Sequence, residues 1–283
     1  MVILSVIIPG RHEPFMQKTI DSLFAASELG SALDVIAVLD GPWMEEPVGD
    51  SRLKIIRIPP KGMRGAINAG LETATGHFIM KVDAHCAFAQ GFDRIMVNKG
   101  EEQKLLIPRR WAIDELAWDK SEDRGPADYH YLRFPLPDPP MSPHRFKHSG
   151  PELDDTMSFQ GSCWMADRRF FLERIGLLDD SKETYGSFAA EQLEIGLKYW
   201  LGGYEVKVYK GTWYAHMFKM PRHYGVGFHK KGNFRHGWNW ATWHWLNDRE
   251  PGMVRPFSWL VEKFWPVPSW PDDWREQWKA QAG

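Results

Sequence analysis

The stretch GHFIMKVDAHC at residues 76–86 decides how the rest of the chain folds. Its apolar run predicts a buried strand, which ends at the polar tripeptide Asp83-Ala84-His85. Side chains two apart on an extended strand project to the same side, so the Asp83 carboxylate and the His85 imidazole converge where the strand ends. A carboxylate beside an imidazole is typical of a divalent metal site. The tripeptide is short enough to occur by chance, so its surroundings decide between the two interpretations.

Three short segments rich in β-branched residues precede this strand. The expected strands are residues 2–8, 34–39 and 53–58, and the strand before Asp83 is expected over 77–82. Apolar residues at helical spacing separate the first strand from the second and the third from the fourth. Alternating strands and helices predict an α/β fold, with a mostly parallel central sheet flanked by helices. In such sheets ligands bind outside the carboxyl ends of the strands.

The alternation of expected strands and helices becomes irregular after His85 and returns near residue 158. Between Trp111 and Thr156 seven prolines exclude a long helix or a central strand, and indicate either a substrate-binding loop or a disordered insertion. Asp167 is expected to cap a helix. The other elements expected in this half are strands at 105–107, 158–166, 205–209 and 212–217 and a helix at 189–201.

Charge and composition narrow the class of protein. The chain has 283 residues, a net charge of −2 and a pI near 6.6, which excludes a globally basic nucleic-acid binder. Many of its 15 tryptophans lie near the C-terminus, where we expect a Trp- and Pro-rich arm with one short helix. Two cysteines indicate no disulfide framework, and no apolar stretch approaches the ~18 residues of a membrane span. Because the first strand follows Met1 directly, we expect a cytoplasmic location, the host cytoplasm for a viral protein, and no membrane partner.

Four segments together carry a resemblance to a known family: the strand ending at Pro9, the strand ending at Asp40, residues 62–70, and the strand ending at Asp83-Ala84-His85. Over residues 2–93 the chain resembles the nucleotide-sugar half of a GT-A fold family 2 glycosyltransferase. That family usually shows Asp-x-Asp, whereas Asp-x-His-Cys is similar to the polypeptide N-acetylgalactosaminyltransferases. The resemblance implies a Rossmann-like GT-A domain over 1–220, with a nucleotide-sugar half at 1–93, an acceptor and catalytic half at 157–220, and a basic, Trp-rich extension at 221–283.

The same resemblance implies a metal site. In the N-acetylgalactosaminyltransferases a further histidine completes a manganese site, and His216 stands in the matching place. Asp83, His85 and His216 are therefore the predicted ligands of one divalent cation. The diphosphate of a sugar nucleotide favours Mn²⁺, with Mg²⁺ as the second choice, although one carboxylate and two imidazoles also suit Zn²⁺ and Fe²⁺.

A second resembling block covers residues 160–194, and there Glu191 falls on the glutamate of a Gly-Gly-Glu-Asn element. Both groups of relatives imply that Glu191 is the catalytic carboxylate. It deprotonates the acceptor hydroxyl if the anomeric configuration is inverted, and it stabilises an oxocarbenium-like centre if the configuration is retained. The Asp-x-His signature favours retention. Glu194, one turn further on, is expected to be structural.

The donor nucleotide is expected to contact strand ends and the helix after residue 62. Asp40 suits a ribose or uracil contact, or is a turn residue before Gly41. Arg64 suits the diphosphate or the base as a planar donor, and Glu13 is either a nucleoside contact or a helix N-terminal acid. The complete predicted donor-binding set is Pro9, Arg11, Glu13, Asp40, Arg64, Asn68 and Asp83.

The sequence thus predicts a metal-dependent hexosyltransferase that moves a sugar from a nucleotide sugar, a UDP-sugar, to a hydroxyl. The acceptor is expected in a groove between residues 126–151 and 207–236. If the basic stretch holds a polyanion, a hydroxymethylated pyrimidine in phage-type DNA fits, with Lys230, Lys231 and Arg235 on phosphates. The alternatives are transfer to a protein or glycan hydroxyl, and a nucleotide-sugar-binding module without activity. A nucleotidyltransferase is disfavoured, because no Gly-rich signature follows the first strand.

Overall fold

The computed structural model of this chain describes residues 1–135, 141–218 and 234–282. Its strands are β1 (Leu4–Gly10), β2 (Leu33–Asp40), β3 (Leu53–Ile58), β4 (Phe78–Val82), β5 (Cys86–Phe88), β6 (Lys104–Asp114), β7 (Asp119–Ser121), β8 (Tyr129–Leu132), β9 (Pro143–Phe146), β10 (Leu153–Asp155), β11 (Cys163–Asp167) and β12 (Glu205–His216). Its helices are α1 (Met16–Ala26), α2 (Met63–Thr73), α3 (Phe92–Val97), α4 (Arg168–Phe170), α5 (Glu191–Leu201), α7 (Phe234–Leu246), α8 (Phe257–Lys263) and α9 (Trp274–Ala282), with short helical turns η1 (Gly30–Ala32) and η2 (Phe171–Ile175).

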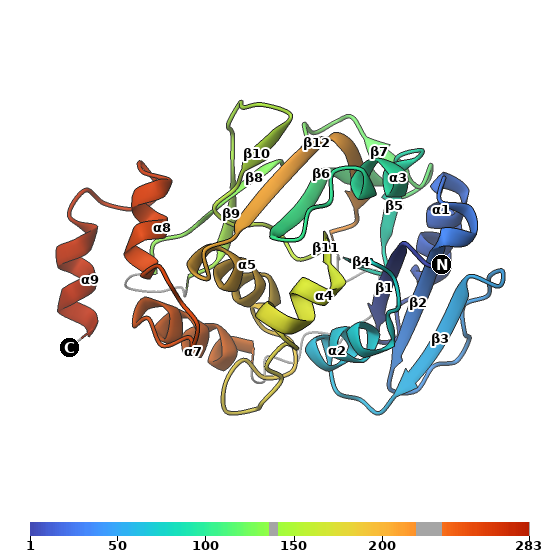
Figure 1. Ribbon diagram of the computed structural model, residues 1–283, viewed down its shortest axis with the longest axis horizontal. Helices are drawn as coiled ribbons and strands as arrows, with labels where there is room; N and C mark the ends of the chain where they lie inside the picture. Colours follow the sequence, from blue (N-terminus) through green and yellow to red (C-terminus); the bar gives the residue numbers. More distant parts are fainter. Residues whose placement is uncertain (136–140, 219–233, 283) are drawn as a thin grey trace.

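One large sheet runs through the molecule in the order β10-β12-β6-β11-β4-β1-β2-β3, with β5 beside β12 and β7 beside β6 (Figure 1). The four strands β3, β2, β1 and β4 are mutually parallel, as the alternation of strands and helices predicts. Beyond β4 the sheet is mixed, because β11 is antiparallel to both β4 and β6 while β6 and β12 are parallel. The predicted α/β class with a central sheet flanked by helices is confirmed.

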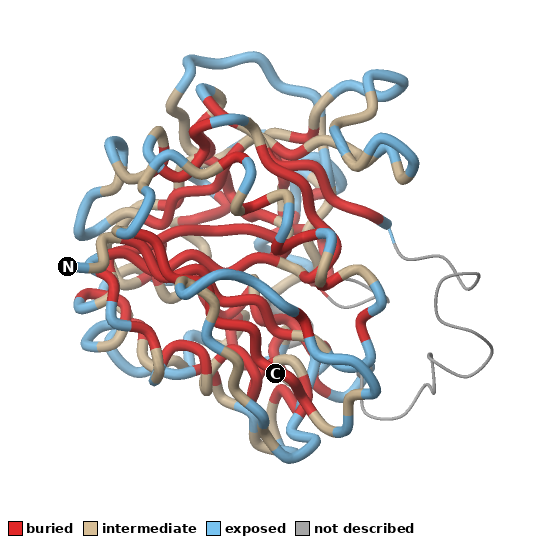
Figure 2. The backbone as a smooth tube through the Cα atoms, turned by 90° about the vertical axis from the view of Figure 1, so that its right-hand side faces the viewer, coloured by how far each residue is buried: buried red, intermediate tan, exposed pale blue. Residues whose placement is uncertain are grey.

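The two faces of the sheet bury different residues of the same strands. Val6 and Ile8 of β1 pack with α1, whereas Ile7 between them packs with Ile67 and Leu71 of α2. This alternation follows from the two-residue period of a strand, and it makes β1 apolar on both faces. Figure 2 shows the buried strands running through the middle of the molecule, with exposed loops outside them.

Strand β12 contains an irregularity that sets its register on β6. Tyr209 pairs with Pro108, and the next registered pair is Trp213 with Arg109. Residues 210–212 therefore stand outside the ladder, opposite a proline that has no N–H to donate. The two strands predicted at 205–209 and 212–217 are a single strand with this interruption.

Two sequence expectations need correction. The Pro-rich interval is not only a loop, because β8 and β9 form a separate two-stranded sheet within it. The C-terminal arm is not extended with one short helix: α7, α8 and α9 lie together at the end of the molecule opposite β3 (Figure 1). In α7, Trp238, Ala241 and Trp245 are buried at helical spacing, a period that the many prolines further on obscured.

The domain boundary expected at residue 220 stays a prediction. Among the residues that the structure describes, no helix has the length and apolar character that crossing a membrane requires.

Candidate active site

Three predicted metal ligands converge at the carboxyl end of β4. Asp83 and His85 follow that strand directly, and His216 ends β12 opposite Cys86 of β5. Nε2 of His216 lies 3.2 Å from Oδ2 of Asp83 and 3.1 Å from Nε2 of His85, and Nε2 of His85 lies 3.7 Å from the same carboxylate oxygen. The sheet thus brings together residues that are 133 positions apart in the chain.

The chemistry of this cluster fits a divalent cation. Burial lowers the pKa of His216 to about 4, so its imidazole is neutral at neutral pH and offers a lone pair. The pKa of Asp83 lies well below its usual range, because Lys81 and the two imidazoles outweigh the opposing effect of burial. Nε2 of His85 and Nε2 of His216 cannot each donate a hydrogen bond to the other and to Oδ2 of Asp83, because each nitrogen carries at most one proton. A cation, in contrast, accepts a lone pair from each of these three atoms.

Two buried groups outside this ligand set fix its geometry. Lys81 is fully buried in β4, and its Nζ lies 2.5 Å from Oδ1 of Asp83 and 2.7 Å from the carbonyl oxygen of Gly161, which leaves Oδ2 toward the histidines. On the other side, Oε2 of Glu13 lies 3.4 Å from Nδ1 of His85. Nδ1 has no hydrogen bond within the described part of the chain, but the negative charge of that carboxylate favours a proton on Nδ1, which leaves Nε2 as the ligand atom. The role of Lys81 was not predicted from the sequence. A lysine inside an otherwise apolar strand could have indicated it, because a buried ammonium group needs an anionic partner.

Glu191 begins α5 beside this cluster. Its carboxylate is buried, and burial together with the nearby Asp83 raises its pKa despite the opposing charge of Lys81. Ala190 before it has a left-handed backbone, with φ 54°, a conformation that positions the first turn and that few non-glycine residues adopt. Gly161 permits the close approach of the loop, because a Cβ there would collide with Oε1 of Glu191.

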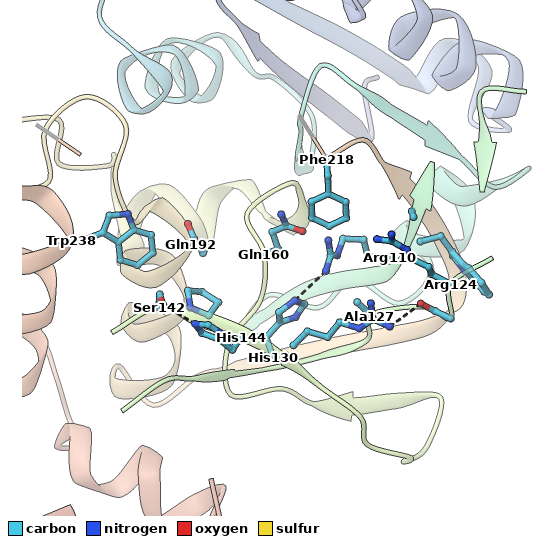
Figure 3. Close-up of a pocket in the computed structure, with 15 residues that line it drawn as sticks. Arg110, Arg124, Ala127, His130, Ser142, His144, Gln160, Gln192, Phe218 and Trp238 are labelled. Carbon is cyan, nitrogen blue, oxygen red and sulfur yellow. Dashed lines mark hydrogen bonds between the residues drawn. The ribbon is translucent and has the colours of Figure 1, made fainter. Parts of the chain in front are cut away.

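A cavity of about 500 Å³ is lined by Gln192, which follows Glu191 in the chain, and by Phe218, which contacts the metal ligand His216 (Figure 3). Gln160 and Gln192 flank it on the side of Gly161 and Glu191, and Phe218 stands edge-on to the ring of His216. Its lining residues are Arg110, Trp111, Ala112, Arg124, Gly125, Ala127, His130, Ser142, Pro143, His144, Arg145, Gln160, Gln192, Phe218 and Trp238.

The cavity lies beside part of the groove predicted for the acceptor, but the cations among its described lining residues are not the predicted ones. Lys230 and Lys231 lie outside the described residues, and Arg235 is exposed in α7 and is not among the residues that line the cavity. Within the described part of the basic stretch, Lys207 pairs with Asp155, and Lys210 bonds Tyr129 and the carbonyl of Gly150. The cavity arginines come instead from β6, from the loop between β7 and β8, and from β9.

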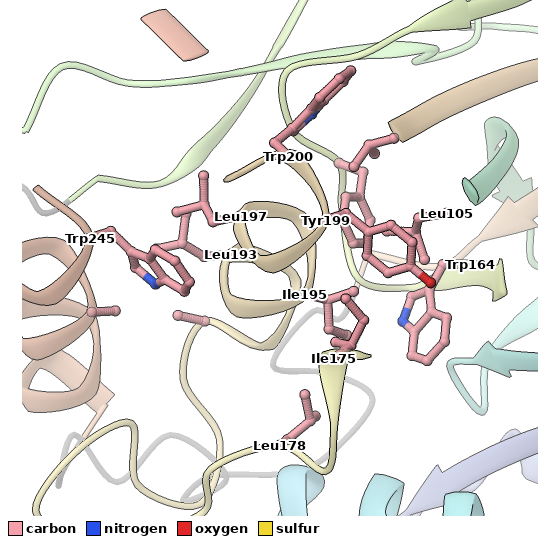
Figure 4. Close-up of a cluster of buried hydrophobic side chains, with 14 of the residues drawn as sticks. Leu105, Trp164, Ile175, Leu178, Leu193, Ile195, Leu197, Tyr199, Trp200 and Trp245 are labelled. Carbon is pink, nitrogen blue, oxygen red and sulfur yellow. The ribbon is translucent and has the colours of Figure 1, made fainter. Parts of the chain in front are cut away.

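Helix α5 is held in place by an ion pair and an apolar cluster. Glu194 accepts from Arg64 and from Lys198, which confirms its expected structural role. Leu193, Leu197 and Trp245 pack on one side of the helix, and Ile195, Tyr199 and Trp164 lie on the other (Figure 4). These contacts position Glu191 at the head of the helix.

Apart from Asp83 and Glu13, which lie at the metal cluster, the residues predicted for the donor divide into two groups. Pro9, Arg11 and Asp40 lie at the ends of β1 and β2, where Arg11 pairs with Asp40 at 2.6 Å. Asp40 also accepts from the backbone N–H groups of Lys61 and Gly62, so it fastens the loop before α2.

Arg64 and Asn68 are directed elsewhere, which corrects the expectation of ligand-facing side chains. Arg64 is fully buried and donates to Glu194 and to the carbonyl oxygens of Asp179 and Ala189. The amide of Asn68 exchanges two hydrogen bonds with the backbone of Leu178. Both side chains thus join α2 to the segment before α5.

Comparison with known proteins places the chain in a family. The model of glycosyl transferase family 2 matches residues 5–175, so the chain belongs to that family of glycosyltransferases. Two curated relatives are polypeptide N-acetylgalactosaminyltransferase 18 from Homo sapiens, 25% identical over 61% of this chain, and N-acetylgalactosaminyltransferase 6 from Drosophila melanogaster, 24% identical over 65%. The chain spans 28% and 27% of their lengths.

Solved structures share the GT-A fold. GalNAc-T7 with UDP, GalNAc and Mn²⁺ superposes with a TM-score of 0.61 over 78% of this chain and 44% of that one, at 16% identity. S. aureus TarS 1–349 with UDP-GlcNAc superposes with a TM-score of 0.53 over 81% of this chain and 62% of that one, at 13% identity. The predicted resemblance to GT-A glycosyltransferases is confirmed.

Proposed function

We propose that this chain transfers a hexose from a UDP-sugar to a hydroxyl with the help of a divalent cation, Mn²⁺ in the first place and Mg²⁺ in the second. The observation that carries the proposal is the convergence of Asp83, His85 and His216 beside Glu191 at the carboxyl end of β4. Two structural neighbours support the donor class, since one was solved with UDP, GalNAc and Mn²⁺ and another with UDP-GlcNAc.

In this proposal Asp83, His85 and His216 hold the cation, which when bound offsets the charge that develops on the departing diphosphate. Lys81 keeps Asp83 ionised and turned toward the histidines, and Glu13 orients His85. Pro9, Arg11 and Asp40 remain the proposed nucleoside contacts at the ends of β1 and β2. Glu13 thus moves from the nucleoside to the support of a metal ligand.

Glu191 is the proposed catalytic carboxylate. A buried carboxylate interacts strongly with positive charge that develops on a sugar ring, because no water screens the two. On the basis of the Asp-x-His signature we propose that the anomeric configuration is retained. NMR of the first product tests this directly, because it identifies the anomer that forms. An α product from an α-linked donor supports retention, and a β product contradicts it.

The acceptor is proposed to bind in the cavity beside Glu191. A hydroxymethylated pyrimidine in DNA remains one proposed acceptor, with a protein or glycan hydroxyl as the alternative. An inactive nucleotide-sugar-binding module would release no UDP under any condition. The cytoplasmic location stays a prediction.

Release of UDP from a panel of UDP-sugars, with Mn²⁺ and with EDTA, tests the proposal. We expect metal-dependent release that His216→Ala abolishes by loss of a ligand. Glu191→Gln should still bind UDP with Mn²⁺ in calorimetry, while turnover falls by about 10²–10⁴-fold. His77→Ala is the matched control, because His77 is an exposed imidazole beside Asp167 that precedes β4, whereas the site lies at the carboxyl end of that strand. Equal UDP release with EDTA, or full turnover by Glu191→Gln, would contradict the proposal.

A further inference from the structure

Arg110 is a buried cation without a counter-ion in the described part of the chain. It is 7% exposed and lies on β6, with its guanidinium in the wall of the cavity (Figure 3). Its described polar contact is one long hydrogen bond, 3.4 Å, from a terminal nitrogen to Nε2 of His130, and its Nε has no partner among the described residues. A buried guanidinium that meets no carboxylate is costly, so such a side chain points to a missing anion.

The neighbours of Arg110 do not neutralise it. Burial and the nearby Arg110 lower the pKa of His130 to about 3, so His130 is a neutral acceptor. Phe218 offers only its ring face, 5.1 Å from the guanidinium carbon. The adjacent residue of β6 shows the contrast, because Arg109 forms two hydrogen bonds with Asp128 on the opposite side of the strand.

Two further arginines face the same space. Arg124 and Arg145 line the cavity, and Arg145 donates to the backbone carbonyls of Gly125 and Pro126. Within the described part of the chain, no aspartate or glutamate lines the cavity. Three guanidinium groups around about 500 Å³ fit a phosphate, which accepts paired hydrogen bonds from arginine and carries more charge than a carboxylate.

The position of the cavity separates this phosphate from the donor. No lining residue comes from residues 1–93, where the ends of β1, β2 and β4 lie. Phe218 packs against both the ring of His216 and the guanidinium of Arg110, and none of the three metal ligands is among the residues that line the cavity. Gln192 places the cavity next to Glu191 in the chain.

We infer that this cavity binds a phosphate group carried by the acceptor, so that the hydroxyl to be glycosylated belongs to a phosphorylated molecule. The inference rests on the proposed glycosyl transfer and names the class of its acceptor. Arg110 is the central contact, and Arg124 and Arg145 contribute from the rim.

Binding of inorganic phosphate in EDTA tests the cavity by itself, because the metal cluster is then empty. We expect phosphate at ten times its Kd to raise the Tm by about 3–6 °C. Arg110→Gln should bind phosphate about 10–100-fold more weakly, Arg110→Lys should keep part of the affinity, and Arg109→Gln is the control on the same strand. Equal phosphate binding by wild type and Arg110→Gln, or none by wild type, would overturn the inference.

A second measurement distinguishes acceptor phosphate from donor diphosphate. UDP with Mn²⁺ is titrated into wild-type protein with and without saturating phosphate, and we expect the same UDP affinity in both. Displacement of phosphate by UDP would assign the cavity to the donor and overturn the inference. UDP binding with Mn²⁺ alone reports on the proposed function, so the two can fail separately.

A third measurement separates a phosphate on the acceptor from free phosphate as a bystander ion. UDP release from the donor is compared for glycerol 3-phosphate and glycerol, and for an oligonucleotide with hydroxymethylated pyrimidines and the free nucleoside. We expect at least one phosphorylated member to stimulate release about tenfold more than its phosphate-free counterpart. Equal stimulation within both pairs would show that the cavity binds phosphate without selecting the acceptor, and would overturn the inference.

Discussion

Arg64 and Arg110 are both buried, yet their surroundings differ. The guanidinium of Arg64 donates to Glu194 and to two carbonyl oxygens, and it stacks on Tyr185. Among the described residues, that of Arg110 has one long hydrogen bond to His130, lies over the ring of Phe218 and otherwise faces a cavity. A buried cation that is fully bonded holds two parts of the chain together, whereas one that is not is available for a ligand. Burial of an arginine therefore indicates function only when its hydrogen bonds are unused.

Of the substitutions that test this difference, we expect Arg64→Gln to have the largest effect on stability. The change removes the guanidinium that neutralises the buried Glu194 carboxylate and leaves only Lys198 beside it. The free energy of unfolding should therefore fall by about 3–5 kcal/mol in urea denaturation. Arg52→Gln, which breaks the exposed pair with Asp50, should cost less than about 1 kcal/mol. Similar losses for both variants would mean that burial does not distinguish these pairs.

Glu13→Gln tests whether metal binding depends on the carboxylate beside Nδ1 of His85. Removing the charge next to Nδ1 of His85 should weaken Mn²⁺ binding by about 10–100-fold in calorimetry. Glu46→Gln changes an exposed carboxylate that pairs with Arg57, and it should bind Mn²⁺ like wild type. Unchanged Mn²⁺ affinity in Glu13→Gln would remove Glu13 from the support of His85.

Gly161→Ala perturbs the wall between the metal cluster and the cavity. The new methyl group meets the carboxylate of Glu191, so we expect a loss of about 1–3 kcal/mol in unfolding free energy together with reduced turnover. Gly125→Ala is the control for stability alone, because a Cβ at Gly125 meets no atom within 4 Å. A fully stable and active Gly161→Ala variant would show that Glu191 has room to move.

Arg110→Gln should have the smallest effect on stability. No described ion pair is lost, so in phosphate-free buffer the free energy of unfolding should change by less than about 1 kcal/mol, or rise. Urea denaturation beside Arg64→Gln measures the difference. A loss as large as that of Arg64→Gln would make Arg110 a structural residue and remove the contrast.

The first half of the fold was predictable from the sequence because its signals are local. The apolar runs that became β1 to β4 are bounded by Pro, Gly or Asp, and the metal ligands Asp83 and His85 follow one of those runs directly. His216 was predictable only through the resemblance, since nothing in its own neighbourhood distinguishes it from a packed histidine.

The missed residues depend on tertiary pairing. Arg109 and Arg110 are adjacent in the chain, and only the fold shows that one meets Asp128 while the other meets none of the described carboxylates. Arg64 was expected at the ligand because a planar donor suits a diphosphate, but Glu194, 130 residues away, lies opposite it. The helix α7 was missed because its tryptophans were interpreted with the prolines that follow them.

The irregularity of β12 has a consequence for how length variation is tolerated in this chain. Residues 210–212 are extra residues on β12 that have no partner on β6. Tyr209 before them pairs with Pro108, and Trp213 after them pairs with the next residue, Arg109. Deleting them would leave a continuous strand and an intact sheet. Because Trp213 would then follow Tyr209 directly, as Arg109 follows Pro108, the second half of the strand would keep its partners, and the chain can change length here without moving His216 from its place opposite Ala112.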